Sequence, residues 1–232
     1  RRLRKASREL SGLRDSAAIV DTFLRLRKRY PKRLAEHTYG ILRRALLEGR
    51  ERGERGARRD GMLDRVANQL DKTRAKAKLW KAPALEVPAL TDVVALSYRR
   101  SRRAMKRARR SRLPATLHGW RKELKTLWYQ LRLVKPLAPG VTPLVAGVKR
   151  LETELGEDHN LVVLAATLRA CSELKTMSAE VRQIDAMAVR MRQGLRKRLF
   201  AIGARLHHKT TRDFASWLRR LAEQATAKPA AA

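Results

Sequence analysis

Apolar residues recur at intervals of three and four positions along almost the whole chain, the spacing that gathers them on one face of an α-helix. Ala, Leu, Arg, Lys and Glu dominate the composition, and all of them favour helix. No stretch alternates apolar and polar residues for long enough to indicate a strand. The pattern therefore predicts an all-α protein. We expect helices over residues 2–12, 14–29, 31–50, 61–80, 90–111, 115–135, 142–156, 159–174, 178–206 and 208–225.

Glycine and proline interrupt this pattern in four segments, which we expect to be loops. These segments are residues 49–61, 81–88, 112–116 and 135–143. The last residues of the chain, TAKPAAA at 226–232, are expected to form a disordered tail.

The segment ATLHGWRKELKTLWYQL, residues 115–131, predicts a helix with one apolar face and one cationic face. The apolar face, which we expect to be buried, consists of Leu117, Trp120, Leu124, Leu127 and Leu131. The opposite arc carries His118, Arg121, Lys122 and Lys125. A solvated helix face usually mixes both signs, because i,i+4 pairs of opposite charge stabilise it by about 0.2–0.5 kcal/mol each. A cationic face without acidic partners indicates a site for an anion.

The preceding helix carries a second cationic stripe, in YRRSRRAMKRARR at residues 98–110. Its members are Arg99, Arg102, Arg103, Lys106, Arg109 and Arg110. Because only a short proline turn separates the two helices, we expect an antiparallel pair whose stripes share one wall of a groove. Arg binds phosphate oxygens with a planar fork, and Lys offers a mobile point charge. A single histidine is usually a structural hydrogen-bonding group, but its alignment with three cations makes His118 a candidate binding residue.

The overall charge points to the same kind of partner. The chain has 232 residues, with 55 Lys and Arg against 22 Asp and Glu, which gives a formal net charge of +33. Apolar residues make up 44%, enough for a packed core, so the charge does not indicate a disordered chain. Self-repulsion on this scale destabilises the compact state, and a polyanionic partner explains it. Nucleic acid, an anionic membrane surface and a polyphosphate are all candidates.

Two further features limit the class of protein. No apolar run approaches the ~18–20 residues that a membrane span needs, and the longest clean run is LVVLAATL at 161–168. Cys171 is the only cysteine, so it cannot form an intrachain disulfide. We expect it to be a small core residue in a protein of the reducing cytoplasm.

A weak internal repeat relates residues 8–26 to residues 153–170. In both copies we expect a helix to end in Glu-Leu and a polar turn to follow, with Asp15 and Asn160 as the N-caps of the next helices. These two residues are 145 positions apart, so a first-copy partner for the helix that carries His118 would lie before residue 1. We therefore expect the sequence to lack an opening basic helix.

Four motifs give the chain a resemblance to CHAD domains, the conserved-histidine α-helical domains. LHxxRKxxKxxxY at residues 117–129 and LGEDHN at 155–160 resemble the second half of that family. LSGLRD at 10–15 resembles a turn of its first half, and IGARLHHKTTRDFASWL at 202–218 resembles its closing helices. The resemblance implies a single domain over residues 1–225, with a first half at 1–89 and a second half at 90–225. It implies an all-α bundle of two pseudo-symmetric antiparallel halves that line a basic central groove or pore.

The same resemblance implies a function. CHAD domains bind inorganic polyphosphate and are associated with polyphosphate granules in the bacterial cytoplasm, and no cofactor or metal ion is implied. The implied polyphosphate-binding residues are Arg99, Arg102, Arg103, Lys106, His118, Arg121, Lys122, Lys125, Lys149 and Lys209. The sequence departs from the family pattern where Trp128 replaces an arginine and where the second turn reads His159-Asn160 rather than Asn-Asp.

Catalysis finds little support in the sequence, and we expect a binding protein rather than an enzyme. His207 and His208 are adjacent, so on a helix they point about 100° apart and cannot share a metal ion. No glycine-rich loop follows a strand, so no nucleotide cradle is indicated. Glu152 and Glu154 could suggest a metal-binding pair, but they fall on a predicted helix, and we expect them to be solvated.

Nucleic acid is the alternative partner, because it is also a polymer of phosphates. Single-strand binding needs exposed aromatic side chains on which bases stack, and aromatic residues make up 5% of this chain. Trp120 falls on the apolar face and is expected in the core, whereas Tyr129 lies on the cationic side, where stacking stays open. A membrane-surface protein would need a helix with free apolar area, and we expect these helices to bury theirs against one another.

Overall fold

The computed structural model describes residues 2–79 and 87–227, which are almost entirely helical. Their elements are α1 (Arg2–Glu9), α2 (Ser11–Arg29), α3 (Glu36–Arg59), α4 (Met62–Lys78), α5 (Val87–Ser111), α6 (Pro114–Val134), the 3₁₀ helix η1 (Pro139–Val141), α7 (Thr142–Ala170), the 3₁₀ helix η2 (Ser172–Met177), α8 (Ser178–Leu206) and α9 (Thr211–Ala227). The described residues form no strand, so the all-α prediction is confirmed. None of the helices in these two ranges is sufficiently long and apolar to cross a membrane.

The chain forms two compact units. The first combines Arg1–Ala82 with Asn160–Met191, and the second combines Pro83–His159 with Arg192–Ala232. Both α7 and α8 therefore contribute one part to each unit. The pseudo-symmetry of two halves and the central groove stay predictions.

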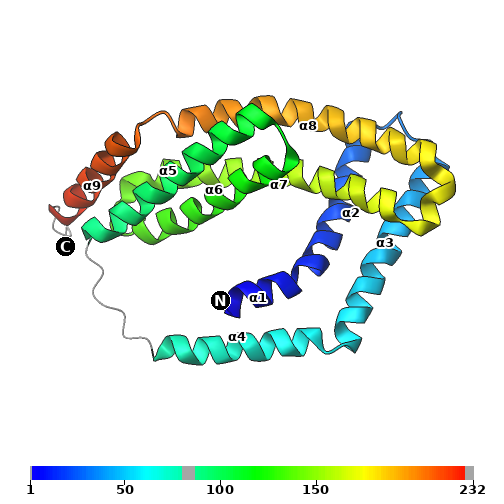
Figure 1. Cartoon of the computed structure of the whole chain (residues 1–232), viewed down its shortest axis with the longest axis horizontal. Helices are drawn as coiled ribbons and strands as arrows, with labels where there is room; N and C mark the ends of the chain where they lie inside the picture. The colour runs from blue at the N-terminus through cyan, green and yellow to red at the C-terminus, as the bar shows by residue number, and fades with distance from the viewer. Residues whose placement is uncertain (1, 80–86, 228–232) are drawn as a thin grey trace, which may run out of the picture. The chain divides into compact units, whose positions relative to one another are not determined.

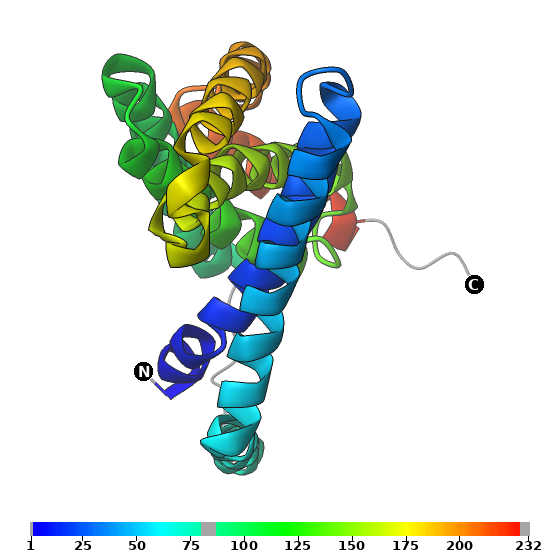
Figure 2. The same cartoon turned by 90° about the vertical axis from the view of Figure 1, so that its right-hand side faces the viewer.

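In the first unit α3 lies along α2, and α1 packs on α4. Figure 2 shows the first pair, with α3 in light blue and cyan in front of the darker α2. Phe23 of α2 and Leu42 of α3 are fully buried, and Phe23 stacks on Tyr39 with ring centroids 5.4 Å apart. Arg52 of α3 makes a 3.1 Å ion pair with Glu173 of η2. Apolar packing thus joins α2 to α3, and the surface ion pair joins α3 to η2, which lies far from it in the sequence.

In the second unit α5 and α6 form an antiparallel pair (Figure 1). The turn between them contains Arg112, which adopts a left-handed conformation with φ of 53°. Pro114 then begins α6, at a position where the N–H that proline lacks has no helical partner. The predicted apolar face of this helix is buried at every position, which confirms it: Leu117, Trp120, Leu124, Leu127 and Leu131.

Close packing in the second unit depends on Gly203 of α8. A Cβ atom on this residue would lie 2.7 Å from the Trp120 ring and 2.8 Å from the sulfur of Met105, so only glycine fits. α9 packs on α5, where the rings of Tyr98 and Phe214 stack with centroids 3.9 Å apart. Burial raises the pKa of Tyr98 to about 12. These contacts build the apolar interior behind the cationic surface of α5 and α6.

His207 fastens the end of α8 to α5. Its Nε2 lies 3.0 Å from the hydroxyl of Ser101, and its Nδ1 lies 2.9 Å from the carbonyl oxygen of Gly203. Because a carbonyl can only accept, the neutral ring carries its proton on Nδ1 and accepts the Ser101 hydroxyl at Nε2. Burial lowers the pKa of His207 to about 4, against the opposing effect of the Gly203 hydrogen bond.

The predicted loop at 49–61 is wrong, because α3 continues to Arg59. Three ion pairs at i,i+4 spacing stabilise the helix across its glycines. They join Arg50 to Glu54 at 2.7 Å, Arg55 to Glu51 at 3.3 Å and Arg52 to Glu48 at 3.9 Å. The chain turns only at Asp60 and Gly61, and Gly61 adopts a φ of 60° that favours glycine.

The predicted start of this helix at residue 31 is also wrong, because α3 begins at Glu36. Arg27 of α2 donates to the carbonyl oxygens of Pro31 and Leu34, each at 2.5 Å. These hydrogen bonds hold residues 31–35 as a turn. The predicted break at 81–88 and the predicted tail at 226–232 lie largely outside the described residues.

The two predicted capping turns are helical as well. Asp15 lies inside α2, where it pairs with Arg14 at 3.1 Å, and Asn160 lies inside α7, so neither residue is an N-cap. The separate helices predicted at 142–156 and 159–174 are one helix that ends at residue 170, and η2 follows it. Gly156 suggested a turn, but a Cβ atom there would lie 3.2 Å from Nε of Arg121. The absence of a side chain at Gly156 therefore leaves space for the Arg121 side chain of α6, and α7 continues through this residue.

Cys171 differs from the expectation of a core residue, because it is only half-buried. Its thiol donates to a carboxylate oxygen of Glu173 at 3.1 Å. Burial and this hydrogen bond raise the pKa of the thiol.

Candidate anion-binding surface

α5 presents a strongly cationic surface. It carries eight basic side chains against one acidic side chain, Asp92. From the predicted set, Arg99, Arg103 and Lys106 are exposed. Arg102 is half-buried, and its Nε donates to the carbonyl oxygen of His207 at 3.3 Å. Most of the α5 stripe is therefore open to an anion, whereas Arg102 already binds the backbone at the end of α8.

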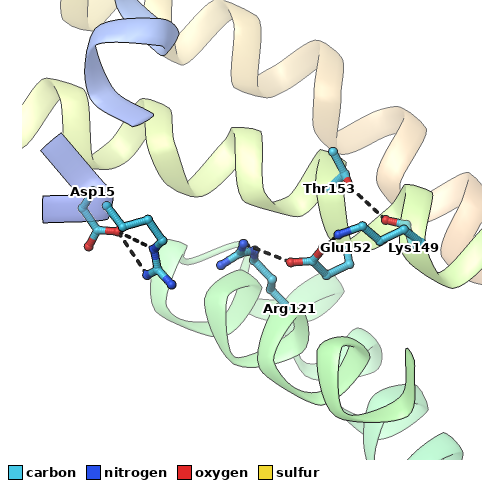
Figure 3. A network of polar contacts seen from close by, with 6 residues as sticks. Asp15, Arg121, Lys149, Glu152 and Thr153 are labelled. Atoms are coloured by element: carbon cyan, nitrogen blue, oxygen red, sulfur yellow. Dashed lines mark hydrogen bonds and ion pairs between the residues drawn. The ribbon is translucent and has the colours of Figure 1, made fainter. Parts of the chain in front are cut away.

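The predicted cations of α6 separate into two groups. Lys122 is exposed and Lys125 is half-buried. Arg121 instead points to α7, where its Nη2 lies 3.0 Å from Oε1 of Glu152 (Figure 3). The Glu152 side chain is only 4% exposed, so this ion pair lies in the interior and joins two helices.

The expectation that Glu152 and Glu154 are solvated is wrong. The second carboxylate oxygen of Glu152 lies 2.9 Å from Nζ of Lys149, one turn earlier on α7. Glu154 is mostly buried and pairs with Arg150 at 3.3 Å and with Arg198 of α8 at 3.9 Å. Burying a carboxylate is costly unless a cation compensates it. Glu152 and Glu154 therefore pair with cations of three helices, α6, α7 and α8.

Trp128 of α6 extends this network through its ring. Nζ of Lys149 lies 4.8 Å from the ring centroid, and the guanidinium carbon of Arg132 lies 4.9 Å from it. Both distances are those of cation–π contacts. Tyr129 follows with half of its surface exposed, and its ring centroid lies 4.8 Å from that of Trp128. The tryptophan that departs from the family pattern thus positions two cations beside an exposed aromatic ring.

His118 contacts a second histidine. Its ring centroid lies 4.4 Å from that of His159 on α7, with the ring planes 38° apart. This contact was not predicted, because the LGEDHN segment was interpreted as a turn. As part of a continuous helix, the same segment places Gly156 against Arg121 and His159 against His118.

A comparison with protein families supports the interpretation of these motifs. The family model of the CHAD domain matches residues 1–169. The chain belongs to the CHAD domain family. Members of this family are associated with polyphosphate binding. The match covers α5, α6 and nearly all of α7, which carry most of the cations described above. No match was found among curated proteins or among solved structures.

In this CHAD domain the predicted binding residues do not all contact one another, and several of them have separate partners within the protein. Arg121 and Lys149 meet at Glu152, whereas Arg102 lies at the end of α8. Lys209 is half-buried, and its carbonyl oxygen accepts a hydrogen bond from the hydroxyl of Tyr98 at 3.1 Å. A groove wall shared by the α5 and α6 stripes stays a prediction. In residues 2–79 and 87–227, no three His, Cys, Asp or Glu side chains form a group that could hold a metal ion.

Three further charged residues of the CHAD domain were not predicted. Asp158 of α7 is buried, and it accepts hydrogen bonds from Arg192 and Arg196 of α8. The i,i+4 spacing of the two arginines was a signal in the sequence, but nothing in the spacing identifies a buried partner on another helix.

Proposed function

We propose that this CHAD domain binds inorganic polyphosphate on the basic surface of α5 and α6. One observation carries the proposal beyond family membership, namely that four cations of α5 and α6 are exposed whereas three carboxylates of α7 are buried or mostly buried and paired. Arg99, Arg103, Lys106 and Lys122 are exposed. Three carboxylates of α7, those of Glu152, Glu154 and Asp158, are buried or mostly buried and paired with cations, so they offer little repulsion to a phosphate chain.

The proposed binding residues divide by the partners that they already have. The set is Arg99, Arg102, Arg103, Lys106, His118, Arg121, Lys122, Lys125, Lys149 and Lys209. Exposed members bind phosphate oxygens directly, and each neutralised phosphate releases a condensed counterion. Arg102, Arg121 and Lys149 have protein partners, so their main contribution is to hold the helices that present the exposed cations.

The proposed role is binding rather than catalysis. Such binding would target the protein to polyphosphate granules of the bacterial cytoplasm or organise those granules. Inorganic polyphosphate carries charge along its whole length and no bases, so a stripe of cations suffices to recognise it. A long chain would engage several of these cations at once, whereas a single small anion would engage few.

Single-stranded nucleic acid is the second candidate, and Tyr129 is the observation that favours it. This ring is half-exposed and lies on the same helix face as Lys125, four residues earlier, and Arg132, three residues later. An aromatic ring between cations can stack on a base while its neighbours bind the adjacent phosphates.

Competition binding distinguishes the two candidates. The labelled ligand is long inorganic polyphosphate, and the competitors are single-stranded and double-stranded DNA at ~150 mM salt, a physiological ionic strength. We expect polyphosphate to bind more tightly than either DNA at equal phosphate concentration. Tighter binding of DNA would overturn the proposal in favour of nucleic acid.

A further inference from the structure

Two arginines of α8 converge on one buried carboxylate of α7. Asp158 is 1% exposed, and its Oδ1 accepts a hydrogen bond from Nε of Arg192 and another from Nε of Arg196, each at 3.1 Å. The two arginines are four residues apart, so their side chains project from the same face of α8. All three residues belong to the second compact unit.

This cluster has more positive charge and more hydrogen-bond donors than its own carboxylate can satisfy. Two guanidinium groups face one carboxylate, which leaves one positive charge. The Nη2 atom of each arginine is buried and has no hydrogen-bond partner among the described residues. An interior cation without a compensating anion is strongly unfavourable, and so is a buried N–H without an acceptor. The two Nη2 atoms can therefore donate to an anion with several acceptor oxygens.

We infer that Asp158, Arg192 and Arg196 form a separate anion site that takes one phosphate group. A phosphate group carries several oxygens around one centre and can accept from both Nη2 atoms at once, as arginine forks do in other phosphate sites. The arginine side chains are 15% and 20% exposed, so the cluster retains a route to solvent.

The inference rests on the proposed function in one respect, because the phosphate group in question is the repeating unit of polyphosphate. The arginines of this site nevertheless lie on a helix other than α5 and α6. Arg192 and Arg196 lie on α8, beyond the residues that the CHAD family model matches. A free phosphate ion and a phosphate unit of a long chain share the chemistry that the cluster recognises.

The test is a calorimetric titration of the full chain with inorganic phosphate, against a chloride blank of the same ionic strength. We expect saturable phosphate binding in the wild type and an affinity loss of roughly tenfold or more in Arg196→Gln, which removes one charge-assisted donor. Arg198→Gln is the matched control, because it makes the same change on the same helix at a side chain that is 63% exposed. Its phosphate affinity should stay within about threefold of wild type.

Asp158→Asn gives an independent result if Arg196→Gln does not fold. Its amide oxygen can still accept both Nε donors, but the negative charge that competes with phosphate is gone, so phosphate should bind more tightly. No saturable binding in the wild type, equal losses in Arg196→Gln and Arg198→Gln, or unchanged affinity in Asp158→Asn would overturn the inference. Long polyphosphate is titrated in parallel. Failure of the wild type to bind the long chain, with phosphate binding intact, would overturn the proposed function and leave this site standing.

Discussion

Arg121 of α6 and Glu152 of α7 form an ion pair of 3.0 Å, in which the glutamate side chain is almost completely buried. The arginine belongs to the cationic stripe of HGWRKELK, but its charge is directed into the protein. The cations of the stripe therefore differ in their surroundings along one helix. Lys122 and Lys125 remain available to a ligand, and Arg121 fixes α6 to the helix that carries the acidic side chains.

Loss of the Arg121 guanidinium should destabilise the fold. Arg121→Gln leaves the buried carboxylate of Glu152 with Lys149 alone. Because Arg121 is 26% exposed and one cation remains, we expect the free energy of unfolding to fall by about 1–3 kcal/mol, less than for a fully isolated buried pair. Urea denaturation measures the change.

Arg150→Gln is the control for this prediction. Arg150 also pairs with a glutamate of α7, but its side chain is 74% exposed, so the loss should be within about 0.5 kcal/mol. Similar losses in both variants would mean that burial of Glu152 does not strengthen its ion pair.

Helix positions and apolar faces could be predicted because they depend on local sequence periodicity. The buried face of α6, from Leu117 to Leu131, illustrates this. The partners of Glu152 could not be predicted, because Arg121 lies on a different helix and helical periodicity contains no information about it. Without knowledge of these partners, the sequence predicts that Glu152 and Glu154 are exposed to solvent.

Glycine was the main source of wrong boundaries. In α3 the glycines between residues 49 and 56 are spanned by ion pairs, and in α7 Gly156 makes space for Arg121. Gly61, by contrast, lies in the turn between α3 and α4 and precedes the first residue of α4, with a φ of 60°. The sequence does not distinguish a glycine that a turn needs from one that close packing needs.

Replacing two different glycines of α8 with alanine should change the free energy of unfolding in opposite directions. In Gly203→Ala, the new Cβ atom would meet the Trp120 ring at 2.7 Å and the Met105 sulfur at 2.8 Å. Overpacking of this kind should lower the free energy of unfolding by about 1–3 kcal/mol. In Gly194→Ala nothing lies within 4 Å of the new atom, so the variant should gain up to about 1 kcal/mol from helix propensity. Thermal unfolding in parallel checks both signs, and stabilisation by Gly203→Ala would contradict the close packing.

His207 should make stability depend on pH. Its pKa is about 4 in the folded protein and near 6.5 in an unfolded chain, so the unfolded state binds more protons between these values. Stability should therefore be complete above pH 6.5 and should fall as the pH drops toward 4, by about 3 kcal/mol from this residue. Urea denaturation across this range is compared with His207→Gln. The difference between the two pH profiles isolates the histidine, and parallel profiles would show that it does not titrate in this way.

Tyr129 should separate the two candidate ligands. Tyr129→Ala removes a half-exposed ring without removing a charge. Polyphosphate has no bases to stack, so its affinity should stay within about twofold of wild type, whereas single-stranded DNA should lose roughly fivefold or more. Fluorescence anisotropy with both ligands measures this. Leu133→Ala, four residues later and 69% exposed, is the control for loss of apolar surface on the same helix. An equal loss for both ligands in Tyr129→Ala would mean that the ring supports the helix and does not stack on bases.

The most direct test of the proposed function compares how polyphosphate affinity depends on the position of the positive charges and on the total net charge. Arg121 is unsuitable for reversal, because Arg121→Glu would bury two carboxylates together. Lys122→Glu with Lys125→Glu places negative charge on the proposed surface, and Lys175→Glu with Lys197→Glu makes the same net change at exposed positions outside it. Circular dichroism should find both variants as helical as the wild type, since glutamate favours helix. For long polyphosphate at ~150 mM salt, we predict that the first variant loses at least roughly tenfold more affinity than the second. Equal losses in two folded variants would contradict a defined polyphosphate site on α5 and α6.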